Sequence, residues 1–303
     1  MSEIGIFMRT HTINESFLSN FKSLVANTSY EVNVLIDETN NDLKKNIKLK
    51  EIEKQSQIYF YTNTLLSKYD LFIHPNSGWH CGDYALIHLF KITKFKFILM
   101  VDYDCRVNVN IDRIIQSLYI NNIDLSGKKI ENKNWDWIHR FNEWILITSN
   151  YKGLLKTEDT LGVFFPLVWC SKPFSKHLLE KRNIHKDLII SKNISLNLYP
   201  FSEIFTGYES RIGNFRFKDL SELIDTNKLT FKNLFHISKI INLSGIYHPC
   251  LENIEYIEKL ISRNTDKEQL LLFEKNISKY VENIHDINLY KTIISVAKKL
   301  RNF

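Results

Sequence analysis

Cysteine is scarce in this chain of 303 residues, and its four cysteines lie far apart in the sequence. They are Cys81, Cys105, Cys170 and Cys250. The sequence contains no Cys-x-x-Cys pair, so we expect neither a disulfide framework nor a structural zinc site. Reduced thiols of this kind are typical of cytoplasmic proteins.

Long apolar runs and a targeting leader are also missing. No apolar run approaches the roughly 18 residues that a membrane-spanning helix requires. The first residues, MSEIGIFMRTHT, do not place a basic segment before an apolar one. We therefore expect a soluble, cytoplasmic protein.

The basic excess of the chain is mild, with a net charge of +6 and a pI of about 8.9. Such a balance fits nucleic acid, an anionic membrane surface or phosphate-bearing ligands, and by itself selects none of them. The sequence has no block of five Lys or Arg residues and no nucleic-acid-binding motif, so no nucleic-acid partner is expected.

The chain has only 9 Gly and 5 Pro residues that could interrupt helices and strands. Hydrophobic residues make up 44% of it, enough for a large core. Strand and helix signals alternate along the first part. Strands are predicted over 4–8, 31–36, 58–62 and 96–101, and helices over 14–26, 41–56, 83–94 and 111–121. This alternation predicts an α/β fold with a Rossmann-like, doubly wound, mostly parallel sheet.

The middle of the chain is less regular, and the end is helical. Strand-like pieces lie at 145–149, 162–169 and 195–199, and a helix at about 172–183. We expect one catalytic domain over 1–250, with a nucleotide half to about 125 and an acceptor half over about 126–250. Residues 251–303 then form a helical extension. Its last helix, 286–301, is basic and amphipathic, and either docks on the domain or lies on a membrane surface.

The strongest motif is the run Phe97-Ile-Leu-Met-Val-Asp-Tyr-Asp. Its apolar part predicts a buried parallel strand, which places Asp102 and Asp104 at the carboxyl end, where open α/β sheets bind ligands. Alternate residues of an extended chain point the same way, so both carboxylates can face one cleft. Hard oxygen ligands suit Mg²⁺ or Mn²⁺, and such a cation suits a diphosphate. The alternative is a pair of acids in a turn or helix cap.

Further candidates follow other predicted strands. Arg9 and Thr10 leave the first strand, where Arg9 either binds a phosphate through its paired donors or is a surface residue. Asp37 ends the second strand, where it can accept hydrogen bonds from a ribose or base, or cap a loop. Asp83 follows Gly82 before a helix, and either holds the hydroxyls of a sugar or caps that helix.

Two candidates lie far along the chain. Glu203 stands among apolar residues, and partial desolvation would raise its pKa, which suits a general base. The alternative is a surface Glu at a helix start. His248 is a candidate third metal ligand or a structural histidine. The tryptophans Trp79, Trp135, Trp137 and Trp144 either stack against a sugar or pack in the core.

In this order the motifs resemble a GT-A type nucleotide-sugar glycosyltransferase, similar to bacterial enzymes that build lipooligosaccharide or capsule. Arg9-Thr10 opens the pattern, Asp37 ends the second strand, and Gly82-Asp83 precedes Asp102-Tyr-Asp104. Ser202-Glu203 and His248 follow late. The first 125 residues carry most of the resemblance, the middle matches loosely, and residues after about 250 match nothing.

The resemblance implies a division of roles. Asp104, with Asp102 and His248, would hold Mn²⁺ or Mg²⁺ against the diphosphate of a nucleotide sugar, with a UDP-sugar expected. Arg9, Thr10, Asp37 and Asp102 would bind the nucleotide, and Asp83 the donor sugar. Glu203 would deprotonate a hydroxyl of a glycan or lipid-linked acceptor, with inversion of anomeric configuration. Surface-glycan synthesis, with membrane contact through the last helix, completes the implied role.

Other functions stay open at this point. A phosphatase of the haloacid dehalogenase type shares the Asp-x-Asp after a strand, but expects Gly-Thr next, where this chain has Cys105-Arg106. A nucleotidyltransferase is a second option, although a Gly-rich phosphate loop near the N-terminus is missing. A non-catalytic scaffold that binds nucleotide or glycan on the same fold is the third.

Overall fold

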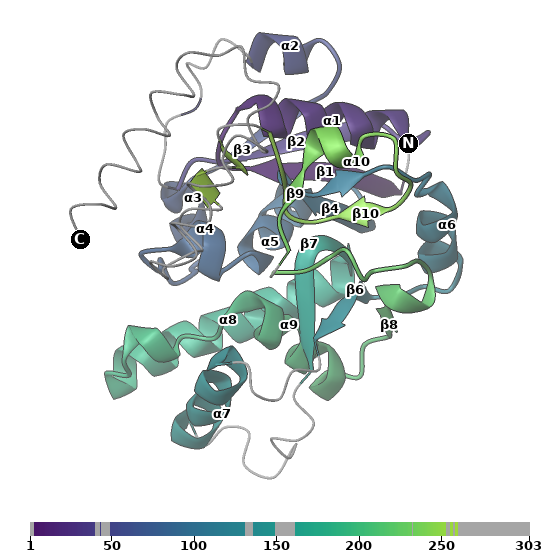
Figure 1. The fold of residues 1–303 in the computed structure, drawn as a ribbon. Helices are drawn as coiled ribbons and strands as arrows, with labels where there is room; N and C mark the ends of the chain where they lie inside the picture. The colour runs from purple at the N-terminus through teal and green to yellow at the C-terminus, as the bar shows by residue number, and fades with distance from the viewer. Residues whose placement is uncertain are drawn as a thin grey trace, which may run out of the picture.

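The computed structural model describes residues 3–39, 43, 49–130, 136–148, 161–231, 233–252, 255–256 and 258–259. Its centre is a seven-stranded sheet with the order β3-β2-β1-β4-β7-β6-β8 (Figure 1). The strands are β1 (Ile4–Thr10), β2 (Val32–Asp37), β3 (Ile58–Tyr61), β4 (Phe97–Asp102), β6 (Leu125–Ile130), β7 (Gly162–Ser171) and β8 (Phe217–Asp219).

Most neighbouring strands of the sheet are parallel. The run β3-β2-β1-β4 is parallel throughout, β7 is antiparallel to both β4 and β6, and β6 is parallel to β8. The four strands predicted from the first hundred residues are all present. The predicted α/β fold with a mostly parallel sheet is therefore confirmed.

Helices cover both faces of this sheet. Helices α1 (Glu15–Ala26) and α6 (Asp112–Ile120) pack on one face, and α5 (Asp83–Ile92), α8 (Lys172–Lys192) and α9 (Ser202–Ile212) on the other. Along β4, Leu99 and Val101 join the first core and Ile98 and Met100 the second, as the two-residue period of a strand requires. Strands buried on both faces explain the continuous apolar runs in the sequence.

Two short-range predictions in the middle of the chain are wrong. The segment 145–149 belongs mostly to helix α7 (Asp136–Thr148), and 195–199 contains the 3₁₀ turn η2 (Leu196–Leu198). In α7 the buried residues Ile138, Phe141 and Trp144 recur every three positions, which is helical spacing. The strand prediction considered only the apolar end of that pattern. The helix predicted at 172–183 is present but extends to Lys192.

Several further elements are short. They are α2 (Leu49–Glu53), α3 (Asn63–Lys68), α4 (Ser77–His80), β5 (Arg106–Val107), η3 (Leu220–Glu222), β9 (Phe235–His236), α10 (Ile237–Ile240), β10 (Ile246–Tyr247) and β11 (Cys250–Leu251). Of the helix predicted at 41–56, α2 is the described part. The late strands matter for function, because β10 pairs with β5 just after β4. The chain near residue 248 thereby returns to the carboxyl end of the central strand.

The C-terminal extension is largely outside the described residues, and so is the helix predicted at 286–301. The division of the chain at residue 250 stays a prediction. The described residues after β11 contact the domain through Ser16, whose Oγ accepts from the backbone N–H of Glu252 at 2.7 Å and donates to Glu255 Oε2 at 2.9 Å, and through Tyr256, whose ring lies 5.1 Å from that of His236. Within the described ranges, no helix combines the length and apolar character that crossing a bilayer requires.

Candidate active site

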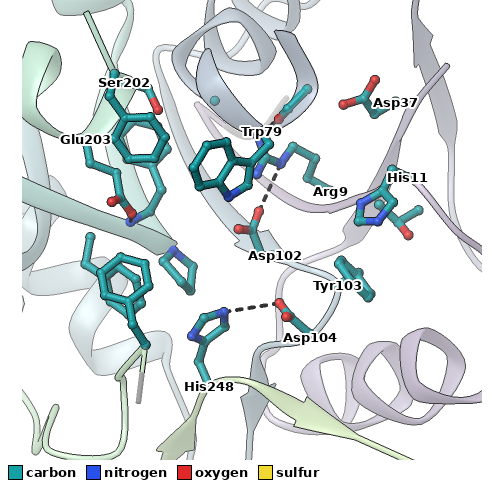
Figure 2. Close-up of a pocket in the computed structure, with 18 of the residues that line it drawn as sticks. Arg9, His11, Asp37, Trp79, Asp102, Tyr103, Asp104, Ser202, Glu203 and His248 are labelled. Carbon is teal, nitrogen blue, oxygen red and sulfur yellow. Dashed lines mark hydrogen bonds and ion pairs between the residues drawn. The ribbon is translucent and has the colours of Figure 1, made fainter. Parts of the chain in front are cut away.

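A cavity of about 430 Å³ opens where β1, β2 and β4 end (Figure 2). Its opposite wall comes from β7 and from the start of α9. Of the eight site residues predicted from the sequence, seven line this cavity: Arg9, Thr10, Asp37, Asp102, Asp104, Glu203 and His248. The topology thus brings together side chains from the first strand and from the last described part of the chain.

Asp104 and His248 face each other in the cavity, with 3.3 Å between Asp104 Oδ1 and His248 Nε2 (Figure 2). The pairing of β10 with β5 places His248 there, and the backbone N–H of Cys250 donates to the carbonyl of Asp104 at 2.7 Å. On the other side of the ring, Nδ1 lies 3.2 Å from the carbonyl of Thr230. A carbonyl only accepts, so Nδ1 carries a proton.

Without a cation, this arrangement of Asp104 and a neutral His248 is electrostatically unfavourable. In the neutral imidazole, Nε2 presents a lone pair to a carboxylate, which is unfavourable unless a proton or a cation lies between them. Adjacent ligands of an octahedral Mg²⁺ lie about 3 Å apart, close to the observed separation. Metal-bound histidines also commonly donate their other ring N–H to a backbone carbonyl, as His248 does. The pair therefore fits two neighbouring positions around one divalent cation.

Asp102 is oriented differently from Asp104. Its Oδ1 accepts from Arg9 Nε at 2.9 Å, across the β1–β4 register that places the two residues side by side. In the described ranges, no group of three or more His, Cys, Asp or Glu side chains is placed to hold a metal ion. Protein ligands to a cation would thus be Asp104 and His248. Asp102 would act through water or by holding Arg9.

The two acids also differ in their pKa values. Burial raises the pKa of Asp102, and the nearby Arg9 only partly offsets that effect. Burial acts in the same direction on Asp104, but a protonated His248, together with Lys259 and a backbone N–H, outweighs burial, so the pKa of Asp104 lies below its ordinary value. Positive charge next to Asp104, whether a proton on His248 or a bound cation, therefore favours its ionised form.

The first two strands supply a second polar group at the cavity. Asp37 is 5% exposed. Its Oδ1 accepts from both the backbone N–H and the hydroxyl of Thr39, at 3.0 and 2.6 Å, and its Oδ2 accepts from Tyr61 at 2.6 Å. Arg9 Nη1 donates to the carbonyl of Gly78 at 3.3 Å. These contacts hold the polar wall before any ligand arrives.

Glu203 lies in the first turn of α9, on the opposite wall. It is 4% exposed, and its Oε1 accepts from the backbone N–H of Phe165 at 3.0 Å. Its Oε2 has no hydrogen-bond partner among the described residues. Burial raises the pKa of Glu203 to about 8, against the opposing effect of the Phe165 N–H. The surface position considered as the alternative for Glu203 is therefore wrong.

Asp83 does not line the cavity, which corrects its predicted place beside a sugar. It is fully buried, and its two oxygens accept from Nε and Nη2 of Arg182 at 2.7 and 2.8 Å. Arg182 in turn donates to the carbonyl of Pro200. A buried charge must be paired with an opposite charge. The ion pair between Asp83 and Arg182 therefore links α5 to α8.

The tryptophans divide between cavity and core. Trp144 is fully buried, so it packs in the core, and Trp135 lies outside the described residues. Trp79 lines the cavity and is 61% exposed. The cavity is also lined by residues that the sequence did not predict, among them Thr39, Gly78, Phe231 and Lys259. No motif marks Lys259, whereas Gly78 lies next to Trp79 and so close to Asp37 that a side chain would collide with its carboxylate.

No protein-family model and no curated protein matches the chain. Among solved structures, mouse xyloside xylosyltransferase 1 in its apo form is similar at 12% identity and a TM-score of 0.47, over 81% of this chain and 97% of that one. Galactosyltransferase LgtC, in complex with donor and acceptor sugar analogs, is similar at 9% identity and a TM-score of 0.46, over 80% and 78%. Both matches are remote in sequence.

Proposed function

We propose that this protein is a metal-dependent glycosyltransferase. It would move a sugar from a nucleoside diphosphate donor, a UDP-sugar in the first instance, to a hydroxyl of a glycan or glycolipid acceptor. The observation that carries the proposal is the facing pair Asp104 and His248 in one cavity with Arg9, Asp37 and Glu203. Cation ligands and a guanidinium can bind the diphosphate of a nucleotide sugar, and a buried acid can deprotonate an acceptor hydroxyl.

The nucleotide half of the cavity lies over the ends of β1, β2 and β4. Crevices at this edge of an open α/β sheet are where such folds bind ligands. Asp37 and Thr10 would contact the ribose or base, and Arg9 would add positive charge toward the phosphates. Asp104 and His248 would hold Mn²⁺ or Mg²⁺, which when bound neutralises charge on the departing diphosphate.

Glu203 would serve as the general base for the acceptor hydroxyl, which makes the transfer an inverting one. Its position on the wall opposite the nucleotide groups supports this role (Figure 2). A base must be ionised, and the pKa of Glu203 is raised to about 8. We therefore expect the rate of transfer to increase as the pH rises through that value.

The biological role is proposed from the resemblance of the sequence to bacterial lipooligosaccharide and capsule enzymes. It would place the reaction in the cytoplasm, with the acceptor linked to lipid at the inner face of the membrane. The mild basic excess of the chain, a net charge of +6, is compatible with an anionic lipid surface.

The proposal is tested by thermal melting with UDP, GDP, CDP and CMP, each with and without Mn²⁺. Ligand at about 100 times its dissociation constant stabilises the native state by about 2.7 kcal/mol. We expect one nucleoside diphosphate to raise the melting temperature, and only when the metal is present. Asp104→Ala should remove that effect. Absence of any shift with metal and nucleotide would refute the proposal, whereas binding without turnover of any nucleotide sugar would favour the scaffold alternative.

A further inference from the structure

Trp79 is a large apolar side chain in an unusual place. It stands in α4 at the cavity and is 61% exposed, although the other described tryptophans are buried or partly buried. Figure 2 draws its ring between Glu203 and Arg9. An indole left open to water at a binding cavity is a surface that a ligand can cover, with a gain in free energy from the apolar area removed from water.

The ring of Trp79 is supported by other aromatic side chains. Phe201, which is buried, lies 4.9 Å from it, and Trp137 lies 5.7 Å from it at an interplanar angle of 65°. Trp137 and Phe201 stack on each other at 4.7 Å, and Arg140 lies over the ring of Trp137 at 4.8 Å. Side chains from α7 and the start of α9 thus hold the indole in place before a ligand binds.

Polar groups for a ligand lie beside this aromatic support. Phe201 is followed directly by Ser202 and Glu203, which both line the cavity. Glu203 Oε2 is buried without a hydrogen-bond partner in the described ranges. A pyranose ring has one face of C–H groups that fits the electron-rich face of an indole, and hydroxyls at its edge that need such polar partners.

The position of Glu203 indicates that a sugar stacked on Trp79 would belong to the acceptor and not to the donor. In the proposed reaction the acceptor hydroxyl lies within hydrogen-bond reach of the base, so the acceptor ring must lie along the wall formed by Glu203 and Phe201. Trp79 contacts that wall through Phe201. The proposed cation ligands Asp104 and His248, by contrast, lie near the end of β4, where the donor diphosphate is expected.

We propose that Trp79 is the stacking platform for a neutral pyranose of the acceptor, held in place by Trp137 and Phe201. This inference rests on the proposed glycosyltransferase function and adds the class of acceptor. It makes Trp79 a specificity-determining residue. It also predicts that the protein has measurable affinity for simple saccharides without nucleotide or metal, because the platform is already formed.

The test uses the full chain and millimolar methyl hexopyranosides and disaccharides, followed by NMR of the indole N–H groups. The Trp79 signal is assigned by its loss in Trp79→Phe. We expect it to shift on saccharide binding. Trp79→Ala should weaken binding about tenfold, equivalent to about 1.4 kcal/mol. Trp79→Phe should keep most of the affinity, and Ile120→Ala, a change at a 74% exposed position on α6, should have no effect.

Three outcomes would overturn the inference. The first is that no saccharide shifts the Trp79 signal, and the second is that Trp79→Ala binds saccharides as well as the wild type. The third is that Trp79→Ala loses affinity for the nucleoside diphosphate with Mn²⁺ instead, which would make the indole a platform for the base. Binding of nucleotide and metal by the wild type is measured on the same samples. Its presence shows that the proposed function stands even if the platform fails.

Discussion

Replacing Glu203 by Gln should change the pH dependence of stability in a way that reports directly on the buried acid. The carboxyl is 4% exposed, and its pKa is raised from 4.5 to about 8. Between these two values the native state binds a proton that the unfolded state has released. The stability of the wild type should therefore fall as the pH rises through this window.

The size of the effect follows from the two pKa values. Each pKa unit corresponds to about 1.4 kcal/mol. Below pH 4.5 both states are protonated and Glu203 costs nothing. At about pH 7 its burial should cost the wild type about 3 kcal/mol, and well above about pH 8 the cost should reach about 5 kcal/mol. The amide of the Glu203→Gln variant would not titrate, and its carbonyl can keep the hydrogen bond from Phe165.

The assay is urea unfolding of the wild type and of Glu203→Gln at several pH values from about 5 to about 9, a range that spans the titration. We expect the variant to gain stability over the wild type as the pH rises toward about 8, and the gain to level off above that value. Glu180→Gln makes the same chemical change at an exposed position of α8 and serves as the control. Taking differences between variants removes the titration of all other groups. Parallel stability curves for wild type and Glu203→Gln would show that the carboxyl is ionised in the native state, and the reasoning would be refuted.

The remaining predictions concern the two halves of the site. Asp104→Ala should abolish metal-dependent nucleotide binding, measured by calorimetry; binding equal to the wild type would contradict the cation site. In Gly78→Ala the new Cβ would lie 2.3 Å from Asp37 Oδ2, so displacement of that carboxylate should weaken nucleotide binding and lower stability by about 1–3 kcal/mol; unchanged affinity would argue against a role of Asp37. Asp83→Ala should cost about 3–5 kcal/mol of stability, because it leaves the charge of Arg182 buried and unpaired, but should leave nucleotide affinity intact at low temperature.

Local patterns were sufficient to predict the part of the sheet formed by β1, β2, β3 and β4. Strands buried on both faces have continuous apolar runs, and the acids that follow them must lie at one edge of a parallel sheet. This reasoning places Arg9, Asp37 and Asp102 together without any knowledge of contacts, and the structure has them at one cavity. The prediction of α1 succeeded because its apolar spacing is helical, and the structure adds that Asn14 caps its first turn.

Long-range contacts explain where the sequence reading failed. Asp83 was predicted to be a site residue because it follows Gly82 and precedes the Asp102-Tyr-Asp104 motif. Its partner, Arg182, is 99 positions away on α8, and no local pattern reveals the pairing. In the same way, the strand prediction at 145–149 failed because periodicity over five residues cannot separate a strand from the end of a longer helix.

The contact between Asp104 and His248 shows how such a distant pairing can still be specified. Two short ladders, β10 with β5 and β11 with β9, fix the chain on either side of His248, and Thr230 accepts from its ring. Because β5 follows β4 within four residues, anything that pairs with β5 must pass the carboxyl end of the central strand. The backbone thus places the imidazole beside Asp104 with Nε2 directed at the carboxylate. Two such side chains side by side would suit a cation, and their separation of 3.3 Å, more than the Asp-x-Asp motif alone, supports the proposed chemistry.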